Sequence, residues 1–236
     1  MKKIIFLLLL SYLSHSQNSF YVEYNLKIAR EEGLFKNNNY LKEMLDKSVS
    51  NQQPIVFKLE INDTISKFSK IKNEIDTSDK VINFAVSIAN YTGIVFNMNN
   101  TFILKQSSLL GNNYFVKYPI INNWKITNET KLIDNYLCYK ATNVYKVVND
   151  VKTFNHPVTA WFCPSLPYKH GPNGYGNLPG LILELQVRNS TYGATLISNN
   201  RKNDVSVNQI KNIKIITISE LEKKLEILND FEKLKK

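Results

Sequence analysis

Residues 171–185 read GPNGYGNLPGLILEL, a dense run of turn-forming residues that leads directly into an apolar alternating pattern. The first ten include four glycines, two prolines and two asparagines. Such residues reach positive φ, fix φ or omit an N–H donor, so together they favour a tight loop. From Leu181 onward, apolar residues alternate with polar ones, as in a strand with one solvent-facing side. We therefore predict a rigid loop that leads into a half-buried strand. Its structural positions are Gly171, Pro172, Asn177, Pro179 and Gly180.

The end of this loop resembles the signature hexapeptide of the GLPGLI family of exported bacterial proteins. The hexapeptide is written here as Asn177-Leu178-Pro179-Gly180-Leu181-Ile182, so an asparagine replaces the first glycine. Asparagine tolerates left-handed backbone geometry better than most residues, and the same turn is therefore expected.

Two further blocks carry the resemblance. Trp124–Thr142 resembles the family's W-x-I…K-x-I…Y-x-C-x-K-A signature, and Ala160–Pro167 resembles its Ala-Trp-aromatic segment. The similarity extends from about Trp124 to Ile197. It implies an exported, β-rich protein, distantly similar to the bowl-shaped accessory domain at the front of a bacterial peptide-N-glycosidase. It implies no established reaction.

The first 16 residues have the pattern of a signal peptide. Lys2 and Lys3 precede an apolar run, and Ser14-His15-Ser16 forms a small-x-small cleavage site. The run is too short to span a bilayer, and no transmembrane segment is expected in the mature chain. We predict export to the periplasm, outer envelope or medium of a Gram-negative bacterium. Residues 17–236 contain no linker-like segment, so we predict a single β-rich domain.

Strand-like patterns recur along the chain with Asn/Gly turns between them. Phe20–Ile28 and Pro54–Asn62 alternate most clearly, and shorter patterns follow at 81–88, 93–98, 101–105, 114–118 and 213–218. This spacing predicts a mainly β fold, an antiparallel curved sheet, sandwich or half-barrel. A short helix is expected at Leu41–Val49.

A second helix is expected at residues 219–235. Ser219 and Glu222 have the spacing of a capping box, and Leu221 and Leu225 begin an apolar stripe. We expect this helix to lie against the sheet; a membrane-surface or partner helix is the alternative.

The chain has 30 Lys and Arg against 20 Asp and Glu, a net charge of +10. The lysines are scattered, with no basic arm or basic helix, so we expect a solvated surface and no nucleic-acid binding. Peripheral association with an anionic envelope stays open.

Cys138 and Cys163 are the only cysteines. An exported protein enters an oxidising compartment, so we predict a disulfide between them. The alternative is a metal or nucleophile site that also uses His156 and His170. These four residues lack the close spacing that metal ligands usually show, and no cofactor or metal site is predicted.

No catalytic motif is recognisable, and no catalytic residue is predicted. G-x-S-x-G, H-E-x-x-H and P-loop patterns are all missing from the sequence. The sequence therefore favours a non-catalytic role, either binding or envelope support, with an unknown ligand or envelope protein as partner. A secreted hydrolase or metal-binding protein using His156 or His170 is the alternative.

Aromatic residues are frequent near the glycine-proline loop. Trp124, Trp161, Tyr168 and Tyr175 are candidates for a binding surface, because aromatic rings offer a large contact area with a polar handle. The same residues are equally suited to packing that holds the loop in place.

Overall fold

The computed structural model describes residues 20–51, 53–62, 65–71, 79–109, 111–148, 152–199 and 205–234, with side chains of the last helix to residue 227. The predicted signal peptide lies outside the described residues. These residues form twelve strands and three α-helices. In chain order, the elements are β1 (Phe20–Ile28), α1 (Asn39–Ser50), β2 (Ile55–Ile61), β3 (Ile65–Lys70), α2 (Lys80–Ile88), β4 (Val95–Met98), β5 (Phe102–Leu109), β6 (Asn112–Pro119), β7 (Lys125–Ile133), β8 (Tyr136–Val148), β9 (Thr153–Cys163), η1 (Pro172–Gly174), β10 (Leu181–Val187), β11 (Ser190–Ser198), η2 (Val207–Ile210), β12 (Ile215–Thr217) and α3 (Ile218–Leu234).

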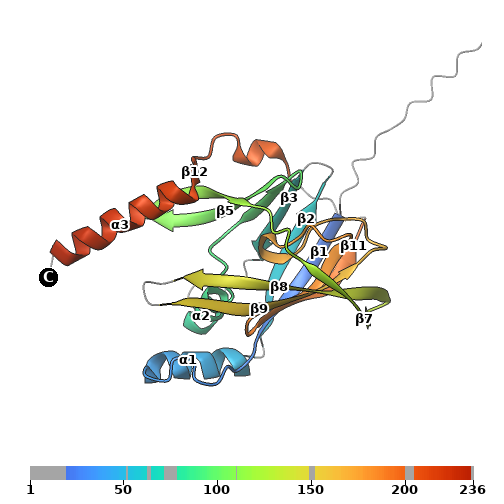
Figure 1. Cartoon of the computed structure of the whole chain (residues 1–236), viewed down its shortest axis with the longest axis horizontal. Coiled ribbons are helices and arrows are strands. Elements are labelled where there is room, and N and C mark those ends of the chain that lie inside the picture. The colour runs from blue at the N-terminus through green and yellow to red at the C-terminus, as the bar shows by residue number, and fades with distance from the viewer. Residues whose placement is uncertain are drawn as a thin grey trace, which may run out of the picture.

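The strands form one open, curved sheet in the order β12-β6-β5-β4-β3-β2-β1-β11-β10-β9-β8-β7 (Figure 1). Neighbours pair antiparallel except for β12 and β6, which are parallel. The prediction of a mainly β fold with a curved antiparallel sheet is confirmed. Most pairs join strands that are adjacent in sequence, while β1 lies between β2 and β11 and so connects the two halves of the chain.

The main core lies on one face of the central strands. Alternate residues of β1 are buried as the sequence pattern predicts, and Val22 and Tyr24 are completely enclosed. On β2 the same pattern buries Ile55, Phe57 and Leu59. Because side chains on a strand alternate between its faces, a period of two is enough to define this face of the sheet.

A smaller core covers the other face of β3–β6. It consists of Ile65, Phe96, Leu104, Phe115, Val205 and Ile210, and the last of these lies on η2. These strands are therefore apolar on both sides. Residues 103 and 104 show the consequence, since Ile103 enters the main core and Leu104 enters the smaller one.

The prediction of a strand at residues 81–88 is wrong, because this segment forms helix α2. Asp79 caps the helix, and its Oδ1 accepts hydrogen bonds from the N–H groups of Val81 (2.7 Å) and Ile82 (3.2 Å). Ile82 and Ala85 are buried one helical turn apart. Capping and the buried face outweigh the strand preference of the β-branched residues here.

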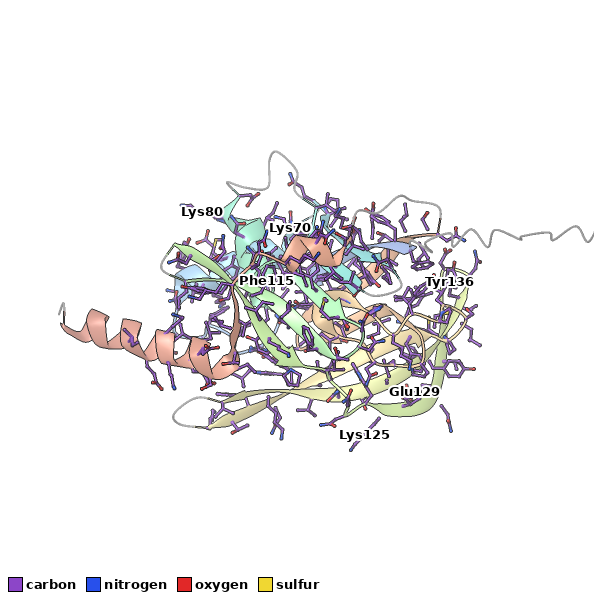
Figure 2. All side chains as sticks on the ribbon, turned by 90° about the horizontal axis from the view of Figure 1, so that it is seen from above. Lys70, Lys80, Phe115, Lys125, Glu129 and Tyr136 are labelled. Atoms are coloured by element: carbon purple, nitrogen blue, oxygen red, sulfur yellow. The ribbon has the colours of Figure 1, made fainter. Side chains whose placement is uncertain are left out.

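The other two helices were predicted, with small differences in their bounds. α1 extends beyond the expected Leu41–Val49 at both ends. α3 begins at Ile218, one residue before the expected start, and its capping box is formed by Thr217 and Glu220 in place of Ser219 and Glu222. α3 contacts β6 and β12 and projects beyond the packed body of side chains (Figure 2).

No helix in the described part of the chain is long and apolar enough to cross a membrane.

Candidate binding cavity

The glycine-proline loop is buried, although loops normally run over protein surfaces. Every residue from Gly171 to Gly176 is enclosed, and η1 packs against β3 and β4. Gly174 has a φ of +81°, and a Cβ there would lie 3.0 Å from a methyl group of Ile103. The loop thus lies inside the curve of the sheet and forms part of the core.

Gly176 is needed because the backbone passes too close to Lys169 for a side chain at this position. A Cβ on Gly176 would lie 2.5 Å from the carbonyl oxygen of Lys169, and Gly176 forms a β-bridge with His170. Asn177 has a φ of +63°, which agrees with the left-handed turn expected where the family hexapeptide has glycine.

Three polar contacts hold the loop. Trp124 Nε1 donates to Gly176 O (2.8 Å), and Asn173 Nδ2 donates to Asn90 O (3.2 Å). Asn177 Nδ2 donates to Asn122 Oδ1. Two contacts come from the β6–β7 connection and one from the residue that follows α2, so two separate segments hold the loop.

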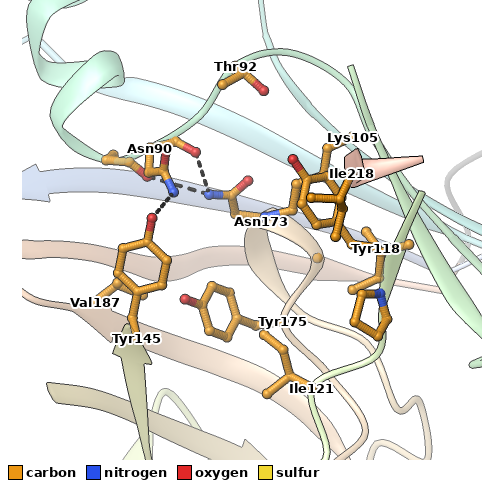
Figure 3. Close-up of a pocket in the computed structure, with 14 residues that line it drawn as sticks. Asn90, Thr92, Lys105, Tyr118, Ile121, Tyr145, Asn173, Tyr175, Val187 and Ile218 are labelled. Atoms are coloured by element: carbon orange, nitrogen blue, oxygen red, sulfur yellow. Dashed lines mark hydrogen bonds between the residues drawn. The ribbon is translucent and has the colours of Figure 1, made fainter. Parts of the chain in front are cut away.

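A cavity of about 440 Å³ opens beside the loop (Figure 3). We call it the Tyr175 cavity. Its apolar wall includes Ala89, Ile103, Pro119, Ile121, Val187 and Ile218. Its polar lining includes Asn90, Thr92, Lys105, Tyr118, Tyr145, Asn173 and Tyr175. The volume lies within the range of about 300–1,000 Å³ that is common for small-molecule sites.

Among the described residues that line the cavity, Lys105 supplies the only charged side chain. It follows Ile103 on the same face of β5, and its Nζ lies 5.8 Å from the centre of the Tyr118 ring. No acidic side chain in the described part of the chain pairs with it. Burial disfavours the ammonium form and lowers the pKa of Lys105 to about 8.

Tyr175 extends from the loop into the cavity, between Tyr145 on one side and Tyr118 with Lys105 on the other (Figure 3). Only 7% of its surface is exposed, and its hydroxyl has no hydrogen-bond partner among the described residues. The Tyr145 hydroxyl accepts a hydrogen bond from Asn90 Nδ2 (3.0 Å), which leaves its own proton free to donate.

Of the four predicted binding residues, only Tyr175 lines the cavity. Trp124 packs edge-on against Tyr175 at 6.3 Å between ring centres and supports the loop. Tyr168 stacks on Phe20, and Lys131 Nζ lies 4.5 Å from the centre of the Trp161 ring, which packs against the main core. The structure therefore does not gather these aromatic residues into one surface.

The two histidines occupy separate environments. His170 is buried, its Nδ1 lies 3.2 Å from Ser66 Oγ, and burial lowers its pKa to about 4. His156 lies on β9, where its ring stacks with those of Tyr145 and Phe154. Within the described residues, no group of three or more His, Cys, Asp or Glu side chains is arranged to hold a metal ion.

Cys138 and Cys163 lie on neighbouring strands. Tyr139 on β8 pairs with Phe162 on β9, so the next residue outward on each strand is a cysteine. Both thiols are buried and reduced in this structure. Burial, together with the neighbouring Cys163 sulfur, raises the pKa of Cys138 to about 12.

Sequence reasoning missed Lys105 and Tyr145. A lysine at the inward position after Ile103 is an unusual feature of an alternating strand, and this signal was present in the sequence. Tyr145 gave no such signal, because its proximity to the loop depends on the curvature of the whole sheet.

Comparison with known proteins gives a family match and a fold match. Residues 149–184 match the model of a family described as "Protein of unknown function (Porph_ging)". No curated protein matches the chain.

The fold is similar to that of PNGF-II in its P21 crystal form, with a TM-score of 0.55 and 16% identity over 88% of this chain. The C2 form gives a TM-score of 0.54 and 17% identity over 87% of this chain. This chain spans about a third of the length of PNGF-II, 33% and 32% in the two forms. The family match covers the segment that contains the glycine-proline loop and is consistent with the GLPGLI resemblance of the sequence.

Proposed function

We propose that this chain is a non-catalytic binding protein of the bacterial envelope that holds a small ligand in the Tyr175 cavity. The observation that carries the proposal is the cavity itself, which combines a mostly apolar wall with a few polar groups that converge on one space. This combination is typical of sites that bind small molecules, because the wall supplies affinity and the polar groups supply orientation.

The rigidity of the site supports a binding role. The loop that carries Tyr175 is buried and hydrogen-bonded to two other segments, the β6–β7 connection and the end of α2. A preorganised site loses less conformational entropy when a ligand binds. Export, which the signal-peptide pattern predicts, would place the site where small molecules from outside the cell can reach it.

The environment of His170 gives less support to a hydrolase than the cavity gives to a binding protein. His170 contacts a serine hydroxyl, but both side chains are buried, and no described carboxylate contacts the imidazole. A catalytic base also needs a pKa near the working pH, whereas burial holds the pKa of His170 at about 4.

A thermal-shift screen of the purified mature protein against lipids, glycans, peptides and small organic acids tests the proposal. We expect at least one class to raise Tm. Val187→Phe, which adds a ring at a cavity-lining position of β10, should abolish that shift.

Gln186→Phe is the matched control. It adds the same ring to the exposed neighbour of Val187 and should leave the shift unchanged. If no compound raises Tm, or if Val187→Phe retains the full shift, the cavity is not the binding site and the proposal is wrong.

A further inference from the structure

The described lining of the Tyr175 cavity carries a positive charge and no negative charge. Its described lining residues include one lysine and no aspartate or glutamate. The exposed Glu222 of α3 acts electrostatically on Tyr118 but is not among the described lining residues. A cavity with these groups attracts negative charge.

Lys105 is half-buried, and its ammonium has no anionic partner among the described residues. Lysines that lose part of their hydration are normally paired, because an ammonium removed from water is costly unless an anion or several acceptors replace the lost solvation. Here the described neighbour is the ring face of Tyr118, which compensates only part of that loss. The groups that surround Lys105 on β4, β6 and α3 include no described carboxylate in contact with it.

Two other polar groups of the lining are donors available for an acceptor, whereas Asn173 Oδ1 is a buried acceptor without a partner among the described residues. The Tyr175 hydroxyl has no partner among the described residues, and the Tyr145 proton is free because its oxygen accepts from Asn90. Lys105 lies on one side of Tyr175 and Tyr145 on the other (Figure 3). Apolar side chains such as Ile103, Ile121 and Val187 line the space with them.

On the basis of the proposed binding function, we propose that the Tyr175 cavity binds a small monocarboxylic acid, whose carboxylate pairs with Lys105 and whose second polar acceptor receives a hydrogen bond from Tyr175 or Tyr145. A single positive charge suits a singly charged carboxylate. A phosphate carries up to two charges and usually requires several donors or an arginine, and no described residue of the lining is an arginine. The apolar wall favours an acid with an acyl or aromatic body.

The affinity of this site for a carboxylate should depend on pH, because binding is linked to the protonation of Lys105. In the free protein Lys105 is half deprotonated near pH 8, and a bound carboxylate raises its pKa because it stabilises the ammonium form. Below pH 8 the affinity should change little with pH. Above pH 8 it should fall towards a limit of about tenfold per pH unit, and binding should take up a proton from the buffer.

The experiment compares acids with their neutral amides. Isothermal titration would use five N-acyl amino acids, including N-acetylphenylalanine, and the corresponding amides, at pH 7 and pH 9. We expect the acids to bind at least tenfold more tightly than the amides at pH 7. Lys105→Met should remove this preference, and the acids alone should lose affinity at pH 9.

Lys117→Met serves as the matched control. It removes the same charge from β6 on the face away from the cavity, where Lys117 lies 4.3 Å from the centre of the Phe102 ring, and it should keep the preference. Inorganic phosphate is included to detect binding of any anion.

The outcomes separate the two proposals. If acids and amides bind equally, if Lys105→Met keeps the preference, if phosphate competes as well as the acids, or if no acid binds, the carboxylate inference is overturned. In the first three cases the binding function stands. That function fails only when the wider screen also finds no compound whose effect depends on position 187.

Discussion

Tyr175 is the residue at which the buried loop meets the cavity. Trp124 supports one side of its ring, and Gly174 and Gly176 let the backbone on either side pass close to Ile103 and Lys169. Burial also raises the pKa of its hydroxyl well above the ordinary range, so the group stays protonated and acts as a donor. The loop therefore has a structural role, and it also contributes Tyr175 and Asn173 to the lining of the cavity.

At the residue scale, we expect Cys138 and Cys163 to form a disulfide when the protein matures in an oxidising compartment. The register of β8 and β9 places the two residues on adjacent strands, one position beyond the Tyr139–Phe162 pair. In the chain-entropy model a bridge closing a loop of this length contributes about 3–4 kcal/mol to the free energy of unfolding. Thiol titration of the denatured, non-reduced protein should find no free thiol.

Reduction should lower the urea midpoint of the wild type, whereas a Cys138→Ser, Cys163→Ser double variant should show the same midpoint with and without reductant. Two titratable thiols in protein isolated from the periplasm would contradict the disulfide.

His170 gives a second prediction at this scale. Its pKa is about 4 in the folded protein and about 6.5 in an unfolded chain, so the unfolded state takes up the proton first as the pH falls. The stability that depends on neutral His170 is present above pH 6.5 and is lost as the pH falls towards 4. Between pH 7 and pH 5 the free energy of unfolding should fall by about 2 kcal/mol from this residue.

Urea unfolding of the wild type and His170→Gln at both pH values measures this loss. The variant is expected to be less stable at pH 7 but to depend less on pH. His156→Gln is the control, because it makes the same substitution at a half-buried histidine of β9 that stacks on Tyr145 and lies outside the buried loop. Equal pH dependence in all three proteins would show that His170 does not carry the effect.

At the element scale, the strands with a clear period of two could be predicted from the sequence. β1 and β2 are examples, because one face is buried along their whole length. The pattern of apolar residues did not distinguish α2 from a strand. Its β-branched residues suggest a strand, and the feature that decides for a helix, the Asp79 cap before a buried Ile82–Ala85 face, is visible only when both signals are combined.

Asp79→Ala tests this explanation of α2. The variant loses two hydrogen bonds to the first turn, so the free energy of unfolding should fall by about 1 kcal/mol. Asn83→Ala, on the exposed face of the same helix, should have little effect because alanine is the better helix former. Urea denaturation of both variants measures the difference, and equal stability of Asp79→Ala and the wild type would contradict the role of the cap.

At the scale of the whole molecule, the curved sheet creates a site that the linear sequence does not reveal. β5 and β8 are separated by seven strands in the sheet order, yet Lys105 and Tyr145 line the same cavity. The sequence indicated the loop and Tyr175, because glycine, proline and asparagine are informative about local backbone geometry. It could not indicate the opposite wall, because sheet curvature is the sum of small contributions from many strand pairs.

A crystal structure of the mature protein grown with N-acetylphenylalanine tests the binding account most directly. The account predicts ligand density in the Tyr175 cavity, with the carboxylate at hydrogen-bond distance from Lys105 Nζ and the body against Tyr175. A cavity that stays empty or is filled by side chains, while the ligand binds elsewhere on the lysine-rich surface, would contradict it.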